Sequence, residues 1–195
     1  MRRSLLAATA AIALSAAALQ GASSARAADY TIDPSHTHIL FTVNHLGFSN
    51  MIGLFTVMAG TFSFDPANVE ASKVKVTIKT DSLSTQFGPR DADLKGADWF
   101  NVTEFPEMTF TGTGYSKTDE HSGTITGNLT LLGVTKPITL NVTFNRAALR
   151  PTDKKQAAGF SATGKLKRSE FGMKTYIPYI GDDVSLIIET EGTNG

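Results

Sequence analysis

Three histidines and one arginine are the side chains whose type and spacing could support specific chemistry. His36 and His38 stand two residues apart, a spacing at which two histidines on one strand can reach a single metal ion. No carboxylate stands nearby in phase as a third ligand, and the preceding residues Asp33, Pro34 and Ser35 are typical of a turn. We therefore expect no metal site, and a His36 that is hydrogen-bonded for structural reasons.

His45 ends a segment of strict alternation. It shares one side of a predicted strand with Ile39, Phe41 and Val43, while Leu40 and its alternate neighbours face the other side. A titratable ring in phase with three large apolar residues suits a pocket that holds an oily ligand by a polar end. The same pattern arises where a strand simply leaves the core at its last residue. The sequence does not separate these two interpretations.

Arg168 directly follows a segment of small and apolar alternate residues and precedes an aromatic-rich segment, Phe171–Tyr179. A planar guanidinium at the mouth of a pocket can bind a pyrophosphate or carboxylate head group through two parallel hydrogen bonds. The alternative is a structural ion pair with Glu170 or with an aspartate of residues 91–98. Both alternatives stay open at this point. Similarly, Trp99 and Phe100 either cover one end of the fold or pack in an ordinary core.

Signatures of catalysis are missing from the sequence. The segment GFSNM at 47–51 lacks the last glycine of a nucleophile elbow. The sequence contains no Gly-rich phosphate loop, zinc-protease motif or dinucleotide fingerprint. The absence of Cys excludes thiol catalysis, Cys-ligated zinc, iron–sulfur clusters and covalently attached haem. We expect a protein that is not an enzyme, with no catalytic residue and no cofactor other than a bound lipid.

The first 27 residues predict export. Arg2 and Arg3 form a basic start, Leu5–Leu19 is uncharged and apolar, and Ala25-Arg26-Ala27 is typical of a cleavage site. The apolar run is shorter than the roughly 20 residues that span a bilayer. We therefore predict a signal peptide cut after Ala27, a periplasmic location and no stable membrane insertion. An uncleaved anchor is the alternative.

Cleavage would leave 168 residues with 15 basic and 18 acidic side chains, a net charge of −3. This mildly acidic balance argues against nucleic acid as a partner and against electrostatic attraction to anionic membranes. A chain of this length can bury a sufficient core without disulfides. Residues 28–195 show no linker or repeat, so we expect one domain. A homodimer is an option that the sequence leaves open.

Beyond the signal segment, alternating β-forming residues dominate. The strand-like segments are Ile39–His45, Gly53–Phe64, Ser72–Thr80, Met108–Tyr115, Ser122–Leu132, Ile138–Arg146, Ala157–Lys167 and Val184–Glu191. Gly, Asp or Pro interrupts nearly every gap, as at hairpin turns. A short helix is expected within residues 86–98, after Pro89. We predict an all-β fold, an eight-stranded antiparallel up-and-down barrel, with a two-layer sandwich as the alternative.

The residues predicted to face inward bear on function. Val74, Val76 and Ile78 form one such apolar row, and comparable rows occur in the segments at 138–144 and 184–188. Other segments place small residues such as Gly127 and Ala162 among large ones. An eight-stranded barrel either fills with side chains or holds one small ligand, and small residues leave room for a long, thin guest. Counting alternate residues does not exclude a solid barrel.

Four ordered motifs resemble the YceI-like, polyisoprenoid-binding proteins, a family with a lipocalin-like barrel. The motifs are YTIDPSHTHILFTVNH at 30–45, SLST at 82–85 with WFNV at 99–102, GNLTLLGVTKP at 127–137, and RSEFGM at 168–173. Thr37 stands where the family often has Ser, and Asn101 and Glu170 stand where it often has Asp. The resemblance spans the mature chain.

The resemblance implies an exported, non-enzymatic protein that holds a polyisoprenoid or a related long-chain amphiphile for carriage or storage. Isoprenoid quinones, prenyl pyrophosphates and fatty acyl chains are the candidate ligands. The alternative is a stress or protein-interaction module with a solid barrel. The resemblance and the inward-facing pattern together predict which residues of the lumen and its mouth contact the ligand. They are Ile39, Phe41, Val43, His45, Val76, Phe110, Leu140, Val142, Arg168, Phe171 and Leu186.

Overall fold

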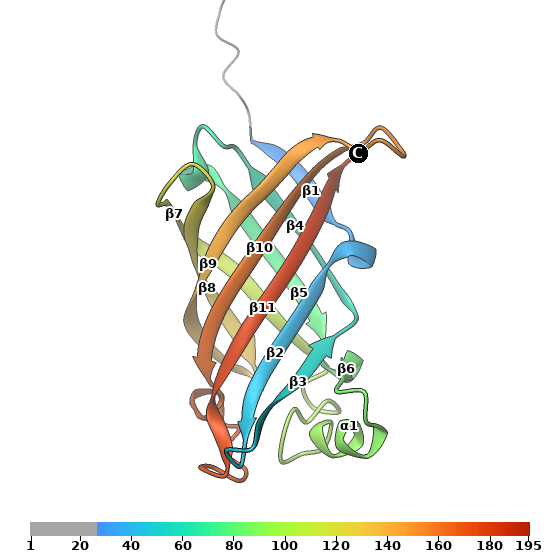
Figure 1. The fold of residues 1–195 in the computed structure, drawn as a ribbon, viewed down its shortest axis with the longest axis vertical. Helices are drawn as coiled ribbons and strands as arrows, with labels where there is room; N and C mark the ends of the chain where they lie inside the picture. The colour runs from blue at the N-terminus through green and yellow to red at the C-terminus, as the bar shows by residue number, and fades with distance from the viewer. Residues whose placement is uncertain (1–26) are drawn as a thin grey trace, which may run out of the picture.

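The computed structural model describes residues 27–195 and shows an antiparallel β-barrel (Figure 1). The predicted signal peptide lies outside the described residues, except for Ala27. The strands are β1 (Ala28–Ile32), β2 (His38–His45), β3 (Ser49–Phe55), β4 (Met58–Phe64), β5 (Lys73–Lys79), β6 (Leu83–Ser84), β7 (Glu107–Lys117), β8 (Ser122–Leu131), β9 (Val134–Leu149), β10 (Gln156–Lys167) and β11 (Ile180–Asn194). The predicted all-β barrel is therefore confirmed.

The barrel closes because β11 is paired along its whole length. Its strand order is β1-β4-β5-β7-β8-β9-β10-β11, and β1 then pairs with the end of β11. A short 3-10 turn, η1 (Pro34–His36), separates β1 from β2, and β2 pairs with the rest of β11. β1 and β2 thus share the eighth position of the barrel. Closure leaves few unpaired strand edges, which would otherwise invite aggregation.

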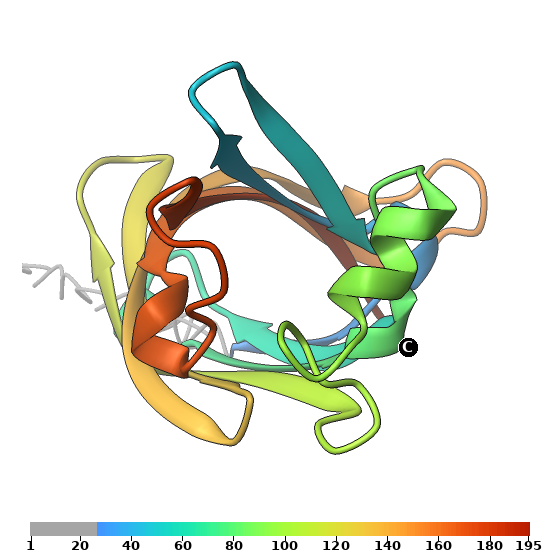
Figure 2. The ribbon, with the colours of Figure 1, turned by 90° about the horizontal axis from the view of Figure 1, so that it is seen from below.

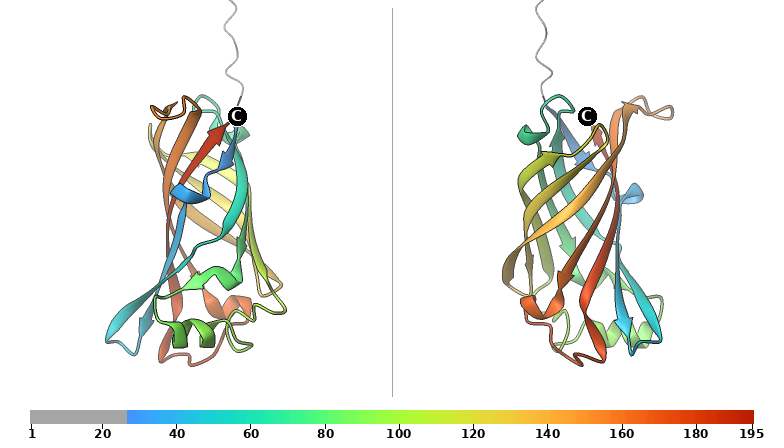
Figure 3. Two further views of the ribbon diagram at one scale, coloured as in Figure 1. Left: turned by 90° about the vertical axis from the view of Figure 1, so that its right-hand side faces the viewer. Right: turned by 60° about the vertical axis from the view of Figure 1, so that its left-hand side comes forward.

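The two ends of the barrel carry different elements (Figures 1 and 3). The lower end in Figure 1 holds the turn between β2 and β3, the helix α1 (Gly88–Leu94) and the segment that follows η4 (Arg168–Phe171). The upper end holds the loops β4–β5, β7–β8 and β9–β10. The expected helix within 86–98 is confirmed. Among the described residues, no helix is long and apolar enough to cross a membrane.

One expected strand is in fact two. The segment Gly53–Phe64 is interrupted at Thr56 and Val57. The main-chain hydrogen bonds of these two residues lie outside the regular strand pairing. The Thr56 N–H donates to the main-chain oxygen of Ser82 over 3.3 Å, and the main-chain oxygen of Val57 accepts from the Lys79 N–H over 2.9 Å. β3 can therefore diverge from the barrel wall and pair with β2 and the short β6 (Figure 2). The sequence analysis also missed β1 and β6.

The residues of the recognised motifs build turns and joints. Leu132 and Gly133 have φ of 52° and 71°, the left-handed values that a two-residue hairpin turn between β8 and β9 requires. Asp91 of α1 accepts hydrogen bonds from the N–H and the hydroxyl of Thr85, which anchors the helix to the chain just after β6. Arg90 donates to the Thr85 hydroxyl over 2.8 Å. These contacts hold α1 against the lower end of the barrel.

Candidate functional site: a cavity along the barrel

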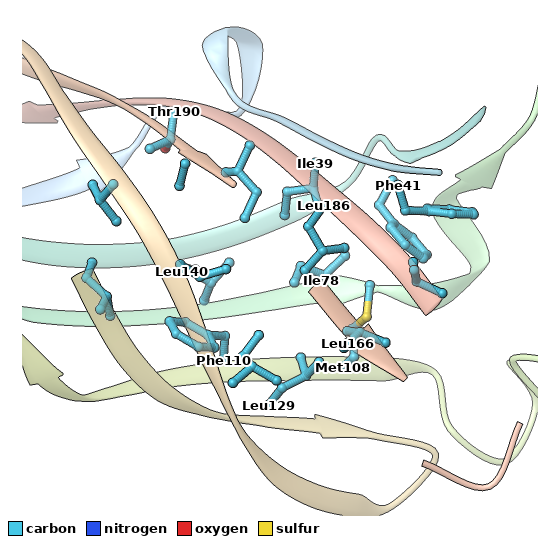
Figure 4. Close-up of a pocket in the computed structure, with 18 of the residues that line it drawn as sticks. Ile39, Phe41, Ile78, Met108, Phe110, Leu129, Leu140, Leu166, Leu186 and Thr190 are labelled. Atoms are coloured by element: carbon cyan, nitrogen blue, oxygen red, sulfur yellow. The ribbon is translucent and has the colours of Figure 1, made fainter. Parts of the chain in front are cut away.

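A cavity of about 940 Å³ occupies the barrel lumen. All of the inward-facing rows expected from alternation line it, including Val74, Val76 and Ile78 of β5. Figure 4 shows Ile39, Ile78 and Leu186 among the side chains that face the cavity. The lining also includes residues of β2, β7, β8, β9, β10 and β11. Small-molecule pockets span roughly 300–1,000 Å³, so this cavity is large for a chain of this size. The alternative of a solid barrel is therefore wrong.

Ten of the eleven residues expected at the site line the cavity. They are Ile39, Phe41, Val43, His45, Val76, Phe110, Leu140, Val142, Arg168 and Leu186. Phe171 does not line it, and this expectation is corrected. η4 turns the chain away from the strand alternation of β10, so Phe171 packs in the core cluster with only 1% of its surface exposed. That these ten residues contact a ligand stays a prediction.

Glycines in the barrel wall determine how aromatic rings lie in the lumen. A Cβ added at Gly53 of β3 would lie 2.2 Å from Cζ of Phe41, its partner on β2. A Cβ at Gly127 of β8 would lie 2.3 Å from Cζ of Phe110. The tip of each ring therefore occupies the space that a side chain at the glycine would need. The small residues do not simply enlarge the cavity, because they let large rings lie against the wall and keep the centre free.

His45 lies at the lower end of the cavity, at the end of β2. Its ring is partly buried, and none of the side-chain hydrogen bonds found among residues 27–195 involves it. The cavity lining beside it includes Leu46, Ile52, Tyr176 and Tyr179, which sequence reasoning missed. Their lack of strand alternation hid them, because they lie in turns and on the divergent β3. His45 therefore faces the lumen, as its alternation with Ile39, Phe41 and Val43 predicted.

Arg168 is buried, with 3% of its surface exposed, and its hydrogen bonds hold the chain segments at the lower end together. Its guanidinium and Nε donate to four main-chain oxygens at 2.8 to 3.0 Å, those of Met173, Thr175, Ile180 and Gly181. The side chain thereby replaces backbone partners for the irregular segment between η4 and β11. Burial lowers the pKa of Arg168 from its usual value, and the charge of Asp182 opposes this shift.

The expected partners of Arg168 are corrected. No ion pair between Arg168 and Glu170, or between Arg168 and an aspartate of 91–98, is found in the described chain. Four of the five N–H groups of Arg168 already donate to carbonyl oxygens. Two parallel hydrogen bonds to an anionic head group would therefore require some of these bonds to break. Asp182 instead accepts from the N–H and hydroxyl of Ser169, both at 2.8 Å, and so caps η4.

The two histidines at 36 and 38 have different surroundings. Nδ1 of His36 lies 3.0 Å from both the Ser35 hydroxyl and the Asp33 carboxylate, and His38 is exposed on the barrel surface. Within residues 27–195 no cluster of three or more potential ligand side chains could hold a metal ion. Asp33 also accepts from Arg150 over 2.9 Å. The hydrogen-bonded, structural His36 expected from the turn is confirmed.

The upper part of the lumen is aromatic, and its loops are charged. Phe64 lies 5.0 Å, centre to centre, from both Phe144 and Phe160. Beyond these rings the cavity lining reaches charged residues at the end of β7 and in the loop that follows it, Lys117, Asp119 and Glu120. At the lower end Trp99 and Phe100 are buried and line the cavity, and Phe100 packs edge-on against Phe55 at 5.5 Å. The lining at the lower end also includes the charged residues Arg90 and Asp93 of α1, so charged side chains border both ends of an apolar lumen.

Comparison with known proteins identifies the family. The family model described as the YceI-like domain matches residues 30–192. The chain belongs to the YceI-like family. Protein YceI of Shigella flexneri is 43% identical over 194 residues, which cover 98% of each chain. The crystal structure of the Campylobacter jejuni YCEI protein is 39% identical, with a TM-score of 0.71, and the match covers 78% of this chain and 90% of that one.

A more distant structure resembles the YceI-like barrel in fold alone. It is a polyisoprenoid binding domain from Saccharophagus degradans implicated in plant cell wall breakdown, with a TM-score of 0.62 at 13% identity. The match covers 87% of this chain and 100% of that domain. The resemblance read from the four motifs is thus confirmed. In this YceI-like chain, residues of the motif at 30–45 line the cavity, Gly133 forms a turn, and Arg168 both lines the cavity and joins the segments around it.

Proposed function

We propose that this protein binds a polyisoprenoid or a related long-chain amphiphile in its lumen and carries or stores it. Isoprenoid quinones, prenyl pyrophosphates and fatty acyl chains are the candidate ligands. The observation that carries the proposal is the long cavity with its apolar wall. Each methylene removed from water contributes roughly 0.8 kcal/mol, so a partly enclosed chain would already bind tightly.

Two further points support a binding protein over an enzyme. Membership of the YceI-like family and the fold shared with a polyisoprenoid binding domain both favour ligand binding. The inward-facing strand rows of the lumen are apolar, and none of the side-chain hydrogen bonds found among residues 27–195 pairs a lining serine or threonine with a lining histidine. Export to the periplasm through a cleaved signal peptide is part of the proposal, and the sequence of residues 1–27 supports it.

Native mass spectrometry of the protein purified from its host tests the proposal. A non-covalent mass increment that disappears on organic extraction and returns on incubation with an isoprenoid lipid is the expected result. Phe41→Trp should abolish this increment, because Phe41 lines the cavity near Phe55 and Phe100 and a larger ring would fill it. Ile187→Trp is the matched control, since Ile187 is exposed and lies outside the cavity lining.

Two results would contradict lipid binding. One is a protein that carries no increment and takes up no isoprenoid or acyl-chain lipid. The other is a folded Phe41→Trp variant that retains lipid as well as Ile187→Trp does. The intact mass of the host-purified protein also checks the export step, because cleavage after Ala27 would remove 27 residues.

A further inference from the structure

Exposed apolar side chains gather around the lower end of the barrel. We call this set the apolar rim: Leu46, Phe48, Ile52, Phe87, Tyr176 and Tyr179. They come from the β2–β3 hairpin, the start of α1 and the segment before β11. Figure 2 shows these elements arranged around the lumen, with the hairpin standing away from the wall. Phe48, at the hairpin tip, is 88% exposed. Such a concentration on a folded chain marks a contact surface.

The apolar rim is continuous with the cavity. Leu46, Ile52, Tyr176 and Tyr179 are exposed and also line the lumen. An oily chain that passes over these side chains would therefore remain against apolar surface from the outside to the inside. A surface used only to hold another protein would have no need to merge with the wall of the cavity.

The charged side chains of the lower end are not spread evenly over its elements. From Pro34 to Phe64 the sequence contains no Lys, Arg, Asp or Glu, and this run includes the whole β2–β3 hairpin. The segment 172–181 contributes one charge, Lys174. At the upper end, by contrast, Lys73, Lys117, Asp119 and Glu120 line the cavity opening. The helix α1 at the lower end does carry charged side chains, among them Arg90 and Asp93. The β2–β3 hairpin, in contrast, could enter a lipid interface without desolvating a lysine, arginine or carboxylate.

We propose that the apolar rim docks reversibly on the surface of a zwitterionic lipid bilayer, with the hairpin tip at the acyl boundary. This proposal rests on the proposed lipid-binding function and names the place where the ligand enters and leaves. Phe and Tyr side chains suit this region, because an apolar ring can enter the acyl boundary while a phenol hydroxyl stays in the headgroup layer. With no cationic cluster in the hairpin, docking depends on apolar burial and not on anionic lipids.

Flotation with phosphatidylcholine vesicles, using the full mature chain, tests the proposal. The wild-type protein should float with the vesicles equally at low and high salt, because screening does not weaken apolar burial. Phe48→Asp should lower the partition coefficient by about tenfold or more, since it removes a buried ring and adds a charge. Leu149→Asp is the matched control: Leu149 is 61% exposed but lies at the upper end, so its flotation should equal wild type.

Lipid retention, measured on the same variants by native mass spectrometry, separates the two proposals. Phe48 is not part of the cavity lining, so Phe48→Asp should keep its bound lipid. Phe48→Ser gives a milder second variant, and thermal melts check that both are folded. Retained lipid with no wild-type flotation overturns docking and leaves lipid binding standing. Flotation that depends on the rim, in a protein that retains no lipid, overturns lipid binding and leaves docking standing. Equal losses in Phe48→Asp and Leu149→Asp overturn the assignment of the rim.

Discussion

The guanidinium carbon of Arg168 lies 5.2 Å from the centre of the Trp99 ring. Arg168 starts η4, whereas Trp99 belongs to the segment that follows α1. The Arg168 guanidinium also holds the segment that leads into β11, through hydrogen bonds to its main-chain oxygens. One buried cation therefore joins two segments that border the lower end of the cavity. Cation–π contacts of desolvated groups contribute up to about 2 kcal/mol.

Arg168→Ala should lower the free energy of unfolding by about 3–5 kcal/mol, because several buried carbonyl oxygens lose their donors at once. Arg168→Lys should recover only part of this loss, since one ammonium cannot reach the same four oxygens. Urea denaturation measures both. Lys167→Ala is the neighbouring control: its pair with Asp183 at 2.7 Å is exposed, and exposed ion pairs contribute little to stability.

The Arg168 prediction also has a binding readout. If the side chain is structural, the folded fraction of Arg168→Lys should bind charged and neutral lipids with equal relative loss. A selective loss for lipids with pyrophosphate or carboxylate heads, without a change in stability, would instead show that Arg168 contacts the head group.

Gly53→Ala should reduce lipid retention. The added methyl group would displace the Phe41 ring from the wall into the lumen, because the ideal Cβ lies 2.2 Å from Cζ. The overpacking should cost about 1–3 kcal/mol of stability. Gly114→Ala is the matched control, since its Cβ would only meet Cβ of Thr126 at 3.9 Å. Mass spectrometric lipid occupancy and thermal melts of both variants test this, and equal occupancy in the two would contradict the role of Phe41.

His45→Leu should keep or raise stability, because it replaces a partly buried imidazole that makes no side-chain hydrogen bond among the described residues. Affinity for lipids with a polar head should fall, and affinity for a plain hydrocarbon chain should change little. Fluorescence competition with a pair of ligands that differ only in the head group measures the difference. Equal losses for both ligands would show that His45 acts on the cavity shape and not on the head.

Asp33→Asn should destabilise the protein by about 1–3 kcal/mol at neutral pH, since charged hydrogen bonds are lost. The hydrogen bond from the Ser35 hydroxyl, with further bonds from His36 and Arg150, lowers the pKa of Asp33 well below its usual value. The folded state therefore binds fewer protons there than the unfolded state does. Its stabilising contribution is complete above the unfolded pKa of about 3.9 and is lost as the pH falls below it.

Unfolding free energies of wild type and Asp33→Asn, measured between neutral and strongly acidic pH, should accordingly converge at low pH. Asp183→Asn serves as the control, because Asp183 is exposed and its pair with Lys167 is weak. A constant difference between wild type and Asp33→Asn down to acidic pH would show that the carboxylate charge is not what stabilises the turn.

Alternation alone was enough to predict which faces of most strands look inward. Side chains of a strand alternate with period two, so rows such as Ile39, Phe41 and Val43 face the same side wherever the strand lies. Eight strand-like segments at hairpin spacing indicated a barrel, and the motifs indicated the family. The short helix followed from a local signal, Pro89 near its start.

The roles of residues outside regular strands depended on tertiary structure. Phe171 lies beyond the end of β10, where η4 breaks the alternation, so no pattern placed it in the core. Arg168 donates to main-chain oxygens of an irregular segment. Because every residue has a main-chain carbonyl, the sequence does not reveal which of them accept. The space left in the lumen depended on pairs such as Phe41 with Gly53 across neighbouring strands, where the ring tip occupies the place of the missing side chain. Register between strands is a long-range property, and only the folded barrel determines it.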